Sequence, residues 1–229
     1  MSEDVRRMFA NIAGKYDLLN DVLSLGIHHS WRRKAVRESG AREGMSVLDC
    51  ACGTGDLSFE FKEKVGETGN VTGTDFCEPM LELAREKAEE KKTDVKFEFT
   101  DVMNLQYEDN KFDIASISFG IRNVDDPRKG LQEMARVLKP GGKVVVIEFG
   151  QPKGIFSLIY KIYSKTIIPL IGKMLSKSDF AYDYLPQTAS KFPCREDFLE
   201  IMNSTGLLKH CRYYSLSFGI AFLYIGERK

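Results

Sequence analysis

A chain of 229 residues, of which 43% are hydrophobic, can bury the core of one α/β domain, which excludes a disordered protein. Basic and acidic residues are equal in number, 33 of each, so the chain lacks the basic excess typical of nucleic-acid binding. We therefore expect no nucleic acid among its partners.

No targeting or membrane-spanning segment is visible in the sequence. The N-terminal stretch MSEDVRRMF is charged and lacks the apolar region of a secretory signal. No apolar run reaches about 18 residues, the length that spans a bilayer. The five cysteines are odd in number and include no CxxC pair, a pattern typical of free, mostly buried thiols in a reducing compartment. We expect a cytoplasmic protein without a metal site.

The first 44 residues predict an N-terminal helical cap. Apolar residues recur there at spacings of three and four, namely Met8, Phe9, Ile12, Tyr16 and Leu19. Gly26 interrupts this pattern, and a second helix is expected over residues 30–39.

From residue 45 the sequence alternates between strand and helix patterns. Strands are expected at 46–49, 69–75, 95–100, 112–119 and 143–149, and helices at 57–65, 78–92 and 127–138. The last helix is expected to end at the turn Pro140-Gly141-Gly142, and an antiparallel pair, 212–214 and 221–225, to close one edge. The pattern predicts the α/β class: a doubly wound, mostly parallel, seven-stranded sheet with helices on both faces.

Residues 151–178 break this alternation with apolar and aromatic side chains and several lysines, and contain no acidic residue. One interpretation is a helical lid packed on the core, with the lysines in solvent. The other, compatible with it, is an apolar cover for a lipid-like substrate that also contacts an anionic membrane surface.

A strand, a glycine turn and a helix start form the first candidate site. Asp49 ends the strand Val47-Leu48-Asp49, and Gly53, Thr54 and Gly55 follow it. Glycines let the backbone approach a ligand closely, and the helix N-terminus presents free N–H groups to a carboxylate or phosphate. Alone, this pattern is common to dinucleotide and S-adenosylmethionine sites.

Three details favour S-adenosylmethionine over NAD. Ser58 stands where the dinucleotide fingerprint has its third glycine, and Asp75 ends the next strand about 20 residues later, where a carboxylate binds ribose hydroxyls. Asp101 and Val102 follow the third strand, placed to bind adenine through a side chain and a backbone N–H. NAD is the second interpretation. The third is that Asp49, Asp75 and Asp101 only cap helices or end strands.

The segment VLDCACGTGD resembles motif I of the class I methyltransferases, with Ala51 in place of the commoner first glycine. Other segments are similar to the ubiquinone/menaquinone biosynthesis C-methyltransferases of the UbiE type. They are VRRMFANIAGKYDLLNDVLSLGIHHSWR, ISFGIRNVDD, RVLKPGGKVVVIEF and YDYLPQTASKFP, so the resemblance extends over nearly the whole chain. Thr188 and His29 depart from the commoner serine and arginine.

The resemblance implies a Rossmann-like class I methyltransferase fold in a single domain, 1–229. Its expected parts are an N-terminal helical cap (1–44), an S-adenosylmethionine-binding core (45–150), a helical lid or substrate segment (151–190), and a C-terminal helix with closing strands (191–229). The cofactor contacts that the resemblance implies come from Thr54, Asp75, Asp101, Val102 and Ser118.

The implied reaction is transfer of a methyl group to a ring carbon of a reduced, prenylated quinol in menaquinone or ubiquinone synthesis. The ring carbon is nucleophilic when a neighbouring hydroxyl is deprotonated, so the substrate must be the quinol and not the quinone. Arg122 is the main candidate to stabilise the ring oxyanion, because arginine stays protonated. Asn123 would orient the ring oxygen or a water. Tyr16, Asp17 and His28 are further candidates for proton transfer, and we expect His28 to titrate near neutrality.

These residues also have structural interpretations: Arg122 as an ion-pair partner, Tyr16 as packing in the cap, and His28 as a capping or packing residue. The rival functions are a small-molecule O-methyltransferase, an NAD-dependent oxidoreductase, and a non-catalytic subunit of a quinone-synthesis complex. The apolar segment 151–178 predicts contact with the inner face of the membrane or a homodimer interface. The sequence leaves the choice between a naphthoquinol and a benzoquinol ring open.

Overall fold

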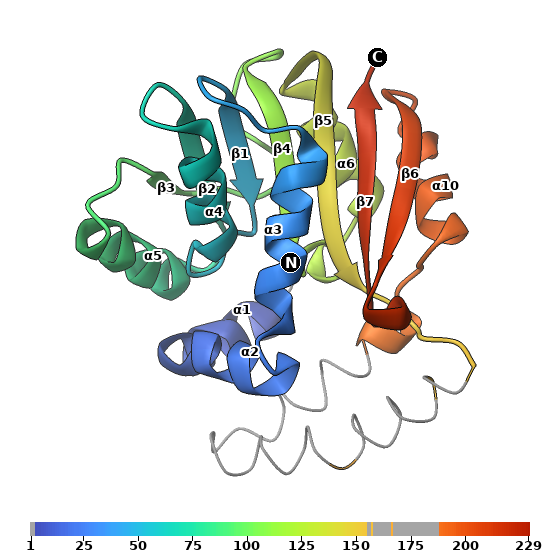
Figure 1. Ribbon diagram of the computed structural model, residues 1–229, viewed down its shortest axis with the longest axis horizontal. Helices are drawn as coiled ribbons and strands as arrows, with labels where there is room; N and C mark the ends of the chain where they lie inside the picture. The colour runs from blue at the N-terminus through green and yellow to red at the C-terminus, as the bar shows by residue number, and fades with distance from the viewer. Residues whose placement is uncertain (1–2, 155–156, 158–165, 167–187) are drawn as a thin grey trace.

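The computed structural model describes residues 3–154, 157, 166 and 188–229. The strands of this part form one seven-stranded sheet with the order β3-β2-β1-β4-β5-β7-β6 (Figure 1). They are β1 (Ser46–Cys50), β2 (Asn70–Asp75), β3 (Lys96–Phe99), β4 (Phe112–Ser118), β5 (Leu138–Phe149), β6 (Leu208–Leu216) and β7 (Ala221–Arg228). The pairs from β3 to β5 are parallel, whereas β7 runs antiparallel to both β5 and β6.

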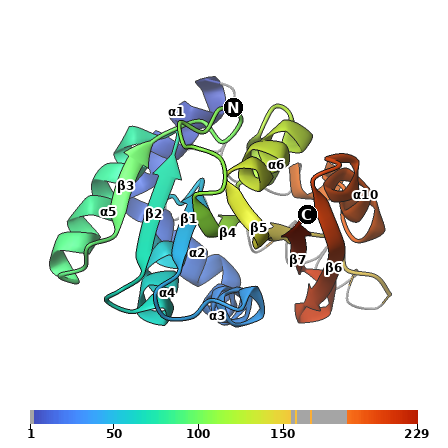
Figure 2. The same ribbon diagram turned by 90° about the horizontal axis from the view of Figure 1, so that it is seen from above.

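Helices cover both faces of the sheet (Figure 2). One hydrophobic cluster joins the sheet to α3 (Ile27–Ser39), α4 (Asp56–Val65) and α5 (Glu78–Glu90). A second cluster joins it to α6 (Pro127–Arg136) and α10 (Glu196–Ser204). The alternation of side chains along β5 explains the division, because Val145 and Ile147 lie in the first cluster and Val144 and Val146 in the second. Both faces are therefore buried, as expected for parallel strands made of continuous apolar runs.

The N-terminal cap lies at the end of the sheet toward which the β1 arrow points (Figure 1). It contains α1 (Glu3–Ile12), the 3-10 turn η1 (Ala13–Lys15) and α2 (Tyr16–Ser24), and both α1 and η1 contact α5. Leu25 and Gly26 then take left-handed backbone angles, with φ of 51° and 71°, and separate α2 from α3. The cap thus covers the carboxyl ends of the parallel strands, where α/β proteins bind ligands.

The expected strand and helix sequence up to β5 is confirmed, with two changes of boundary larger than two residues. The first concerns the turn Pro140-Gly141-Gly142, which does not end a helix: α6 ends at Arg136, and β5 already begins at Leu138. Leu138 pairs with Phe112, and the register shifts before Lys143 pairs with Ile114. Proline has no N–H for the ladder and Gly141 has a φ of 78°, so this segment forms an irregularity inside the strand. The second change is that α3 begins at Ile27 and not at residue 30.

The antiparallel pair expected near the C-terminus is confirmed and longer than expected. The predicted lid lies largely in residues 155–187, of which only Ser157 and Thr166 are described, so that prediction falls outside the described residues. In the described part of the chain, no helix combines the length and the apolar character needed to cross a bilayer.

Candidate active site

The crevice of this fold lies between the carboxyl ends of β1 and β4, where the strand order changes direction. The turn after β1 and the turn after β4 touch there: a Cβ atom added to Gly120 would lie 2.5 Å from the Cβ of Ala51. Ala51 itself has a φ of 48°, in the left-handed region that favours glycine. The glycine turn and the segment 118–123 are therefore packed directly against each other at this point.

The glycine turn is held by the acid that ends β2. Asp75 accepts hydrogen bonds from the backbone N–H of Gly53 and of Cys77, both at 2.9 Å. The carboxyl group is buried, and burial raises the pKa of Asp75 to about 6. Asp75 thus lies at the junction of the turn and α5, where the sequence placed the ribose-binding acid.

Asp49 lies beneath the turn with only 1% of its surface exposed. Its two carboxylate oxygens accept hydrogen bonds from Ser58 Oγ and Ser116 Oγ, each at 2.7 Å. Burial raises the pKa of Asp49 to about 6. In the structure Asp49 therefore connects β1 to α4 and β4.

Thr54 connects the turn to the cap. Its hydroxyl donates to the Asp17 carboxylate at 2.6 Å, and Lys87 Nζ lies 2.7 Å from both Asp17 and Asp56. Asp56 also pairs with Arg32 of α3 at 2.8 Å. Lys87 and Asp56 were not predicted from the sequence, because nothing in their spacing indicates that α2, α4 and α5 meet.

Asp101 and Val102 follow β3 as expected. Val102 is buried, whereas Asp101 is partly exposed and accepts a hydrogen bond from the backbone N–H of Met103 at 2.9 Å. The hydrogen bond from the Thr100 N–H to the Asp75 carbonyl, 3.1 Å long, joins this segment to the end of β2. Asp75 and Asp101, the two acids expected to bind the cofactor, thus lie at the ends of the neighbouring strands β2 and β3.

Two buried polar atoms at the end of β4, Ser118 Oγ and Arg122 Nε, have no hydrogen-bond partner among the described residues. An unsatisfied buried polar group costs about 1–3 kcal/mol, so such atoms are typical of a site that a ligand completes. Ser118 was expected near the reactive sulfur of S-adenosylmethionine, and its unpartnered hydroxyl fits a cofactor in this crevice.

Arg122 forms a buried ion pair, as its structural interpretation expected, with a partner, Glu148, that was not predicted from the sequence. Its Nη1 lies 2.9 Å from Glu148, and the two side chains are only 5% and 1% exposed. Nη1 also donates to the carbonyl of Phe119, and the guanidinium lies 5.3 Å from the ring centroid of Phe149. Glu148 further accepts from the N–H groups of Arg122 and Phe149. The signal in the sequence was a lone acid in the apolar strand VVVIEF.

Tyr16 of the cap faces the same region. Its ring lies 3.6 Å from the position of a Cβ added to Gly53 and packs edge-on against Phe9. Burial raises the pKa of Tyr16, while nearby Arg122 acts to lower it. The phenol is therefore neutral at pH 7 and able to donate a hydrogen bond. Asn123 is buried in the 3-10 turn η2 (Ile121–Asn123) beside Arg122.

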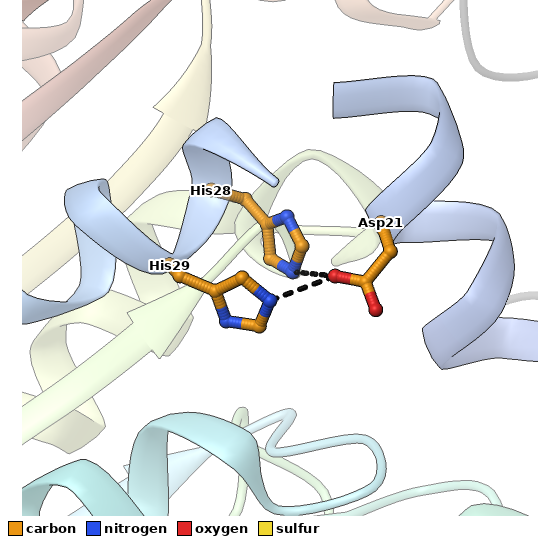
Figure 3. A group of neighbouring side chains, drawn as sticks. All are labelled: Asp21, His28 and His29. Atoms are coloured by element: carbon orange, nitrogen blue, oxygen red, sulfur yellow. Dashed lines mark hydrogen bonds and ion pairs between the residues drawn. The ribbon is translucent and has the colours of Figure 1, made fainter. Parts of the chain in front are cut away.

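The polar contacts of His28 are with residues of α2. Its Nδ1 lies 2.5 Å from Ser24 Oγ, and its Nε2 lies 3.5 Å from Asp21 (Figure 3). Burial, with the charges of Arg32 and His29, lowers the pKa of His28 to about 4. The expectation that His28 titrates near neutrality is therefore wrong, because the residue is only 4% exposed and lies near the charge of Arg32.

The sequence of this chain matches known proteins over nearly its whole length. A model of the ubiE/COQ5 methyltransferase family matches residues 1–228. A ubiquinone/menaquinone biosynthesis C-methyltransferase UbiE from Bdellovibrio bacteriovorus is 54% identical over 99% of this chain and 97% of its own length. A demethylmenaquinone methyltransferase from Deinococcus radiodurans is 43% identical over 98% of this chain and 92% of its own. A demethylmenaquinone methyltransferase from Staphylococcus aureus is 41% identical over 99% of this chain and 94% of its own length.

Solved structures share the fold at lower identity. A SAM-dependent methyltransferase from Thermotoga maritima, titled a possible histamine N-methyltransferase, has a TM-score of 0.68 at 20% identity, covering 97% of this chain and 99% of its own. A SAM-dependent methyltransferase from Aquifex aeolicus has a TM-score of 0.66 at 21% identity, and the match covers 86% of this chain and 89% of the Aquifex chain. At these identities the similarity concerns the fold, which is the Rossmann-like fold expected from the sequence.

Proposed function

This chain belongs to the ubiE/COQ5 methyltransferase family, and from that premise we propose the ring on which it acts and the residues that act there. It is an S-adenosylmethionine-dependent methyltransferase that methylates a ring carbon of a reduced, prenylated quinol in quinone biosynthesis. The ring that we propose is the naphthoquinol of demethylmenaquinol. The names of the relatives from Deinococcus radiodurans and Staphylococcus aureus support this choice.

The proposed cofactor site uses the residues at the carboxyl ends of β1 to β4. Asp75 would bind the ribose, Asp101 and Val102 the adenine, and Ser118 the region of the sulfonium. Gly53, Thr54 and Gly55 would form the backbone of the turn, while Asp49 supports that turn from below through Ser58 and Ser116. When bound, S-adenosylmethionine supplies an electrophilic methyl group on a positively charged sulfur.

Arg122 is proposed to stabilise the ring oxyanion of the quinol. Its guanidinium is fixed by Glu148, by the carbonyl of Phe119 and by the ring of Phe149, so little reorganisation is needed when negative charge develops. One such donor contributes about 2.7–4 kcal/mol in enzymes of other classes. Asn123, the next residue in η2, is proposed to orient the ring oxygen or a water that takes its proton.

Tyr16 is proposed to donate a hydrogen bond to the substrate from the cap. Its raised pKa supports a donor more than a base. For His28 we propose support of the cap and no proton transfer, because burial keeps its ring neutral at physiological pH. We also propose that residues 151–178 cover the prenyl tail at the inner face of the membrane, on the apolar and basic composition of that segment.

The test is methyl transfer from labelled S-adenosylmethionine to short-tailed demethylmenaquinol and to the matching benzoquinol, each with and without a reductant. We expect a carbon-methylated naphthoquinol only under reducing conditions, identified by product mass and fragmentation. Preferred methylation of the benzoquinol would overturn the proposed ring, and a methyl ether product would overturn carbon methylation.

Two arginine variants test the proposed role of Arg122. Arg122→Met should lower kcat per folded molecule by about 10²–10³, the usual effect of losing one oxyanion donor, with unchanged affinity for S-adenosylmethionine. The folded fraction is measured by circular dichroism, because this variant also leaves Glu148 buried without its counterion. The matched control is Arg128→Met, because Arg128 is exposed on α6 and donates to the carbonyl of Ser204. Equal kcat values in the two variants would contradict the role.

A further inference from the structure

Three side chains with metal-ligating atoms converge where α2 meets α3. Asp21, His28 and His29 each offer one ligand atom, and these atoms lie within 4.8 Å of one another (Figure 3). His29 Nε2 lies 2.7 Å and His28 Nε2 lies 3.5 Å from the same oxygen, Asp21 Oδ1. The two imidazole rings lie side by side, with centroids 4.0 Å apart. The Nε2 atoms of His28 and His29 therefore point to the same position, next to Asp21 (Figure 3).

The backbone brings these groups together. Asp21 lies in the last turn of α2, and its carbonyl accepts the N–H of Gly26 at 3.0 Å. The left-handed residues Leu25 and Gly26 reverse the chain, so the first turn of α3, which bears both histidines, returns beside the last turn of α2. The convergence is a property of this tight corner and not of long, movable side chains.

A second group fixes the orientation of His28. Ser24 Oγ lies 2.5 Å from His28 Nδ1, whereas Asp21 lies nearest to the other ring nitrogen, Nε2. With the Nδ1–H donating to Ser24, Nε2 presents its lone pair to the position between the three side chains. Metal-binding histidines are held in this way by a hydrogen bond from their other nitrogen.

We propose that Asp21, His28 and His29 bind a divalent transition-metal ion of the zinc, cobalt or nickel type. Two imidazoles and one carboxylate are a common ligand set for such ions, with the remaining positions taken by water. This proposal revises the expectation of no metal site, which rested on the spacing of the cysteines. It is independent of methyl transfer, since none of the reacting groups proposed above needs the ion.

The nearby charges permit such an ion. Asp21 supplies a negative charge, and 50% of its side chain is exposed, which leaves the position open to entry from solvent. The cation nearest in sequence, Arg32, is paired with Asp56 at 2.8 Å. A bound ion would join α2 to α3. Because Tyr16 and Asp17 lie on α2, while Trp31 on α3 is buried in the core, the ion would fix the cap on the core.

The experiment is titration of the full-length, tag-free protein with Co²⁺, followed by visible absorption and calorimetry. We expect one Co²⁺ per chain with an N/O-type spectrum and no thiolate charge-transfer band. His29→Gln and Asp21→Asn should each lose at least about tenfold in affinity, and Ser24→Ala about 10–100-fold. The chain has three histidines, so His210→Gln on β6 is the matched control and should bind like the wild type.

A second readout separates metal binding from misfolding. Zn²⁺ should raise the midpoint of thermal unfolding for the wild type and for His210→Gln but not for His29→Gln, because an ion that binds only the folded state stabilises it. Circular dichroism of the metal-free variants should match the wild type. Wild-type protein that binds no Co²⁺, binding retained in His29→Gln, or binding through a cysteine thiolate would each overturn the proposal.

Discussion

The ion pair of Arg122 and Glu148 places two opposite charges almost wholly out of water. Removing both charges from solvent is costly, and their attraction at 2.9 Å compensates only while both partners are present. Glu148 also accepts the backbone N–H groups of Arg122 and Phe149, so it holds the turn as well as the guanidinium. The pair therefore positions Arg122 for its proposed role and makes that role sensitive to Glu148.

Glu148→Gln should lower the free energy of unfolding by about 3–5 kcal/mol, because it leaves a buried guanidinium without its counterion. Urea denaturation measures this change. The control is Glu227→Gln: Glu227 pairs with Lys209 at 3.0 Å on the surface, and its loss should cost less than about 1 kcal/mol. Equal losses in the two variants would show that Arg122 does not depend on Glu148.

Asp49 and Asp75 each carry a pKa raised by burial to about 6, from the ordinary value of 3.8 for an aspartate. The folded state binds protons more tightly than the unfolded state, so these groups favour folding below about pH 4 and this contribution is lost as the pH rises to about 6. Both acids therefore make the protein less stable at pH 7 than it would be with neutral groups at these two positions.

Asp49→Asn should raise the free energy of unfolding at pH 7 by at most about 3 kcal/mol, since one pKa unit corresponds to about 1.36 kcal/mol. The gain in the free energy of unfolding should vanish below about pH 4, where Asp49 is protonated in both the folded and the unfolded state. The free energy of unfolding should also depend less steeply on pH between pH 4 and 6 than in the wild type. Denaturant unfolding at several pH values measures both effects. A variant less stable than the wild type at pH 7 would show that the bonds from Ser58 and Ser116 need the carboxylate.

At the scale of elements, the crevice depends on the contact between the turns that follow β1 and β4. Ala51 occupies a left-handed conformation, with a φ of 48°, that costs a residue with a Cβ about 1–2 kcal/mol. Gly120 faces its Cβ so closely that no side chain fits there. The missing first glycine of the motif is thus accommodated by a glycine on the neighbouring strand end.

Gly120→Ala should destabilise the protein by about 1–3 kcal/mol, because its new Cβ would lie 2.5 Å from Ala51. Ala51→Gly alone should stabilise it by about 1 kcal/mol. In the double variant the closest clash is removed, so the two changes should couple by about 0.5–3 kcal/mol in a double-mutant cycle. Gly14→Ala, where a Cβ meets nothing within 4 Å, is the control. Additive effects would contradict direct contact between the turns.

At the scale of the whole molecule, Trp31 reports whether α3 and the rest of the fold unfold together. It is the single tryptophan of the chain and is 6% exposed. Its indole N–H donates to Ser217 Oγ at 3.0 Å, and its ring lies 6.0 Å from that of Phe119. It therefore contacts both the C-terminal turn and the end of β4 from its position on α3.

If residues 1–229 form one domain, as we propose, Trp31 fluorescence and far-ultraviolet circular dichroism should give the same midpoint in urea. The physical reason is that α3 shares a hydrophobic cluster with α4, α5 and the sheet, so it cannot leave without exposing that cluster. A fluorescence transition that precedes loss of circular dichroism would show that α3 unfolds separately from the sheet.

Much of the fold follows from local patterns in the sequence. Alternating apolar runs and Gly or Pro turns predicted the strands from β1 to β5 and the helices between them, because strand and helix periods are set by neighbouring residues. The same patterns placed Asp49, Asp75 and Asp101 at strand ends, since parallel strands of an α/β sheet have their carboxyl ends at one edge, whereas Ser118 was expected there from the family resemblance. The error at Leu138 arose because a proline and two glycines also fit a bulge inside a strand.

Contacts between distant segments were decided only by the tertiary structure. The sequence identified Arg122 but not Glu148, 26 positions later, because β4 and β5 become neighbours only through the order of the sheet. It gave no sign that Lys87 joins Asp17 to Asp56, or that Asp21, His28 and His29 share one corner. It also suggested a near-neutral His28, whereas burial lowers the pKa of that ring. Burial and neighbouring charge depend on packing, and packing is a property of the folded chain.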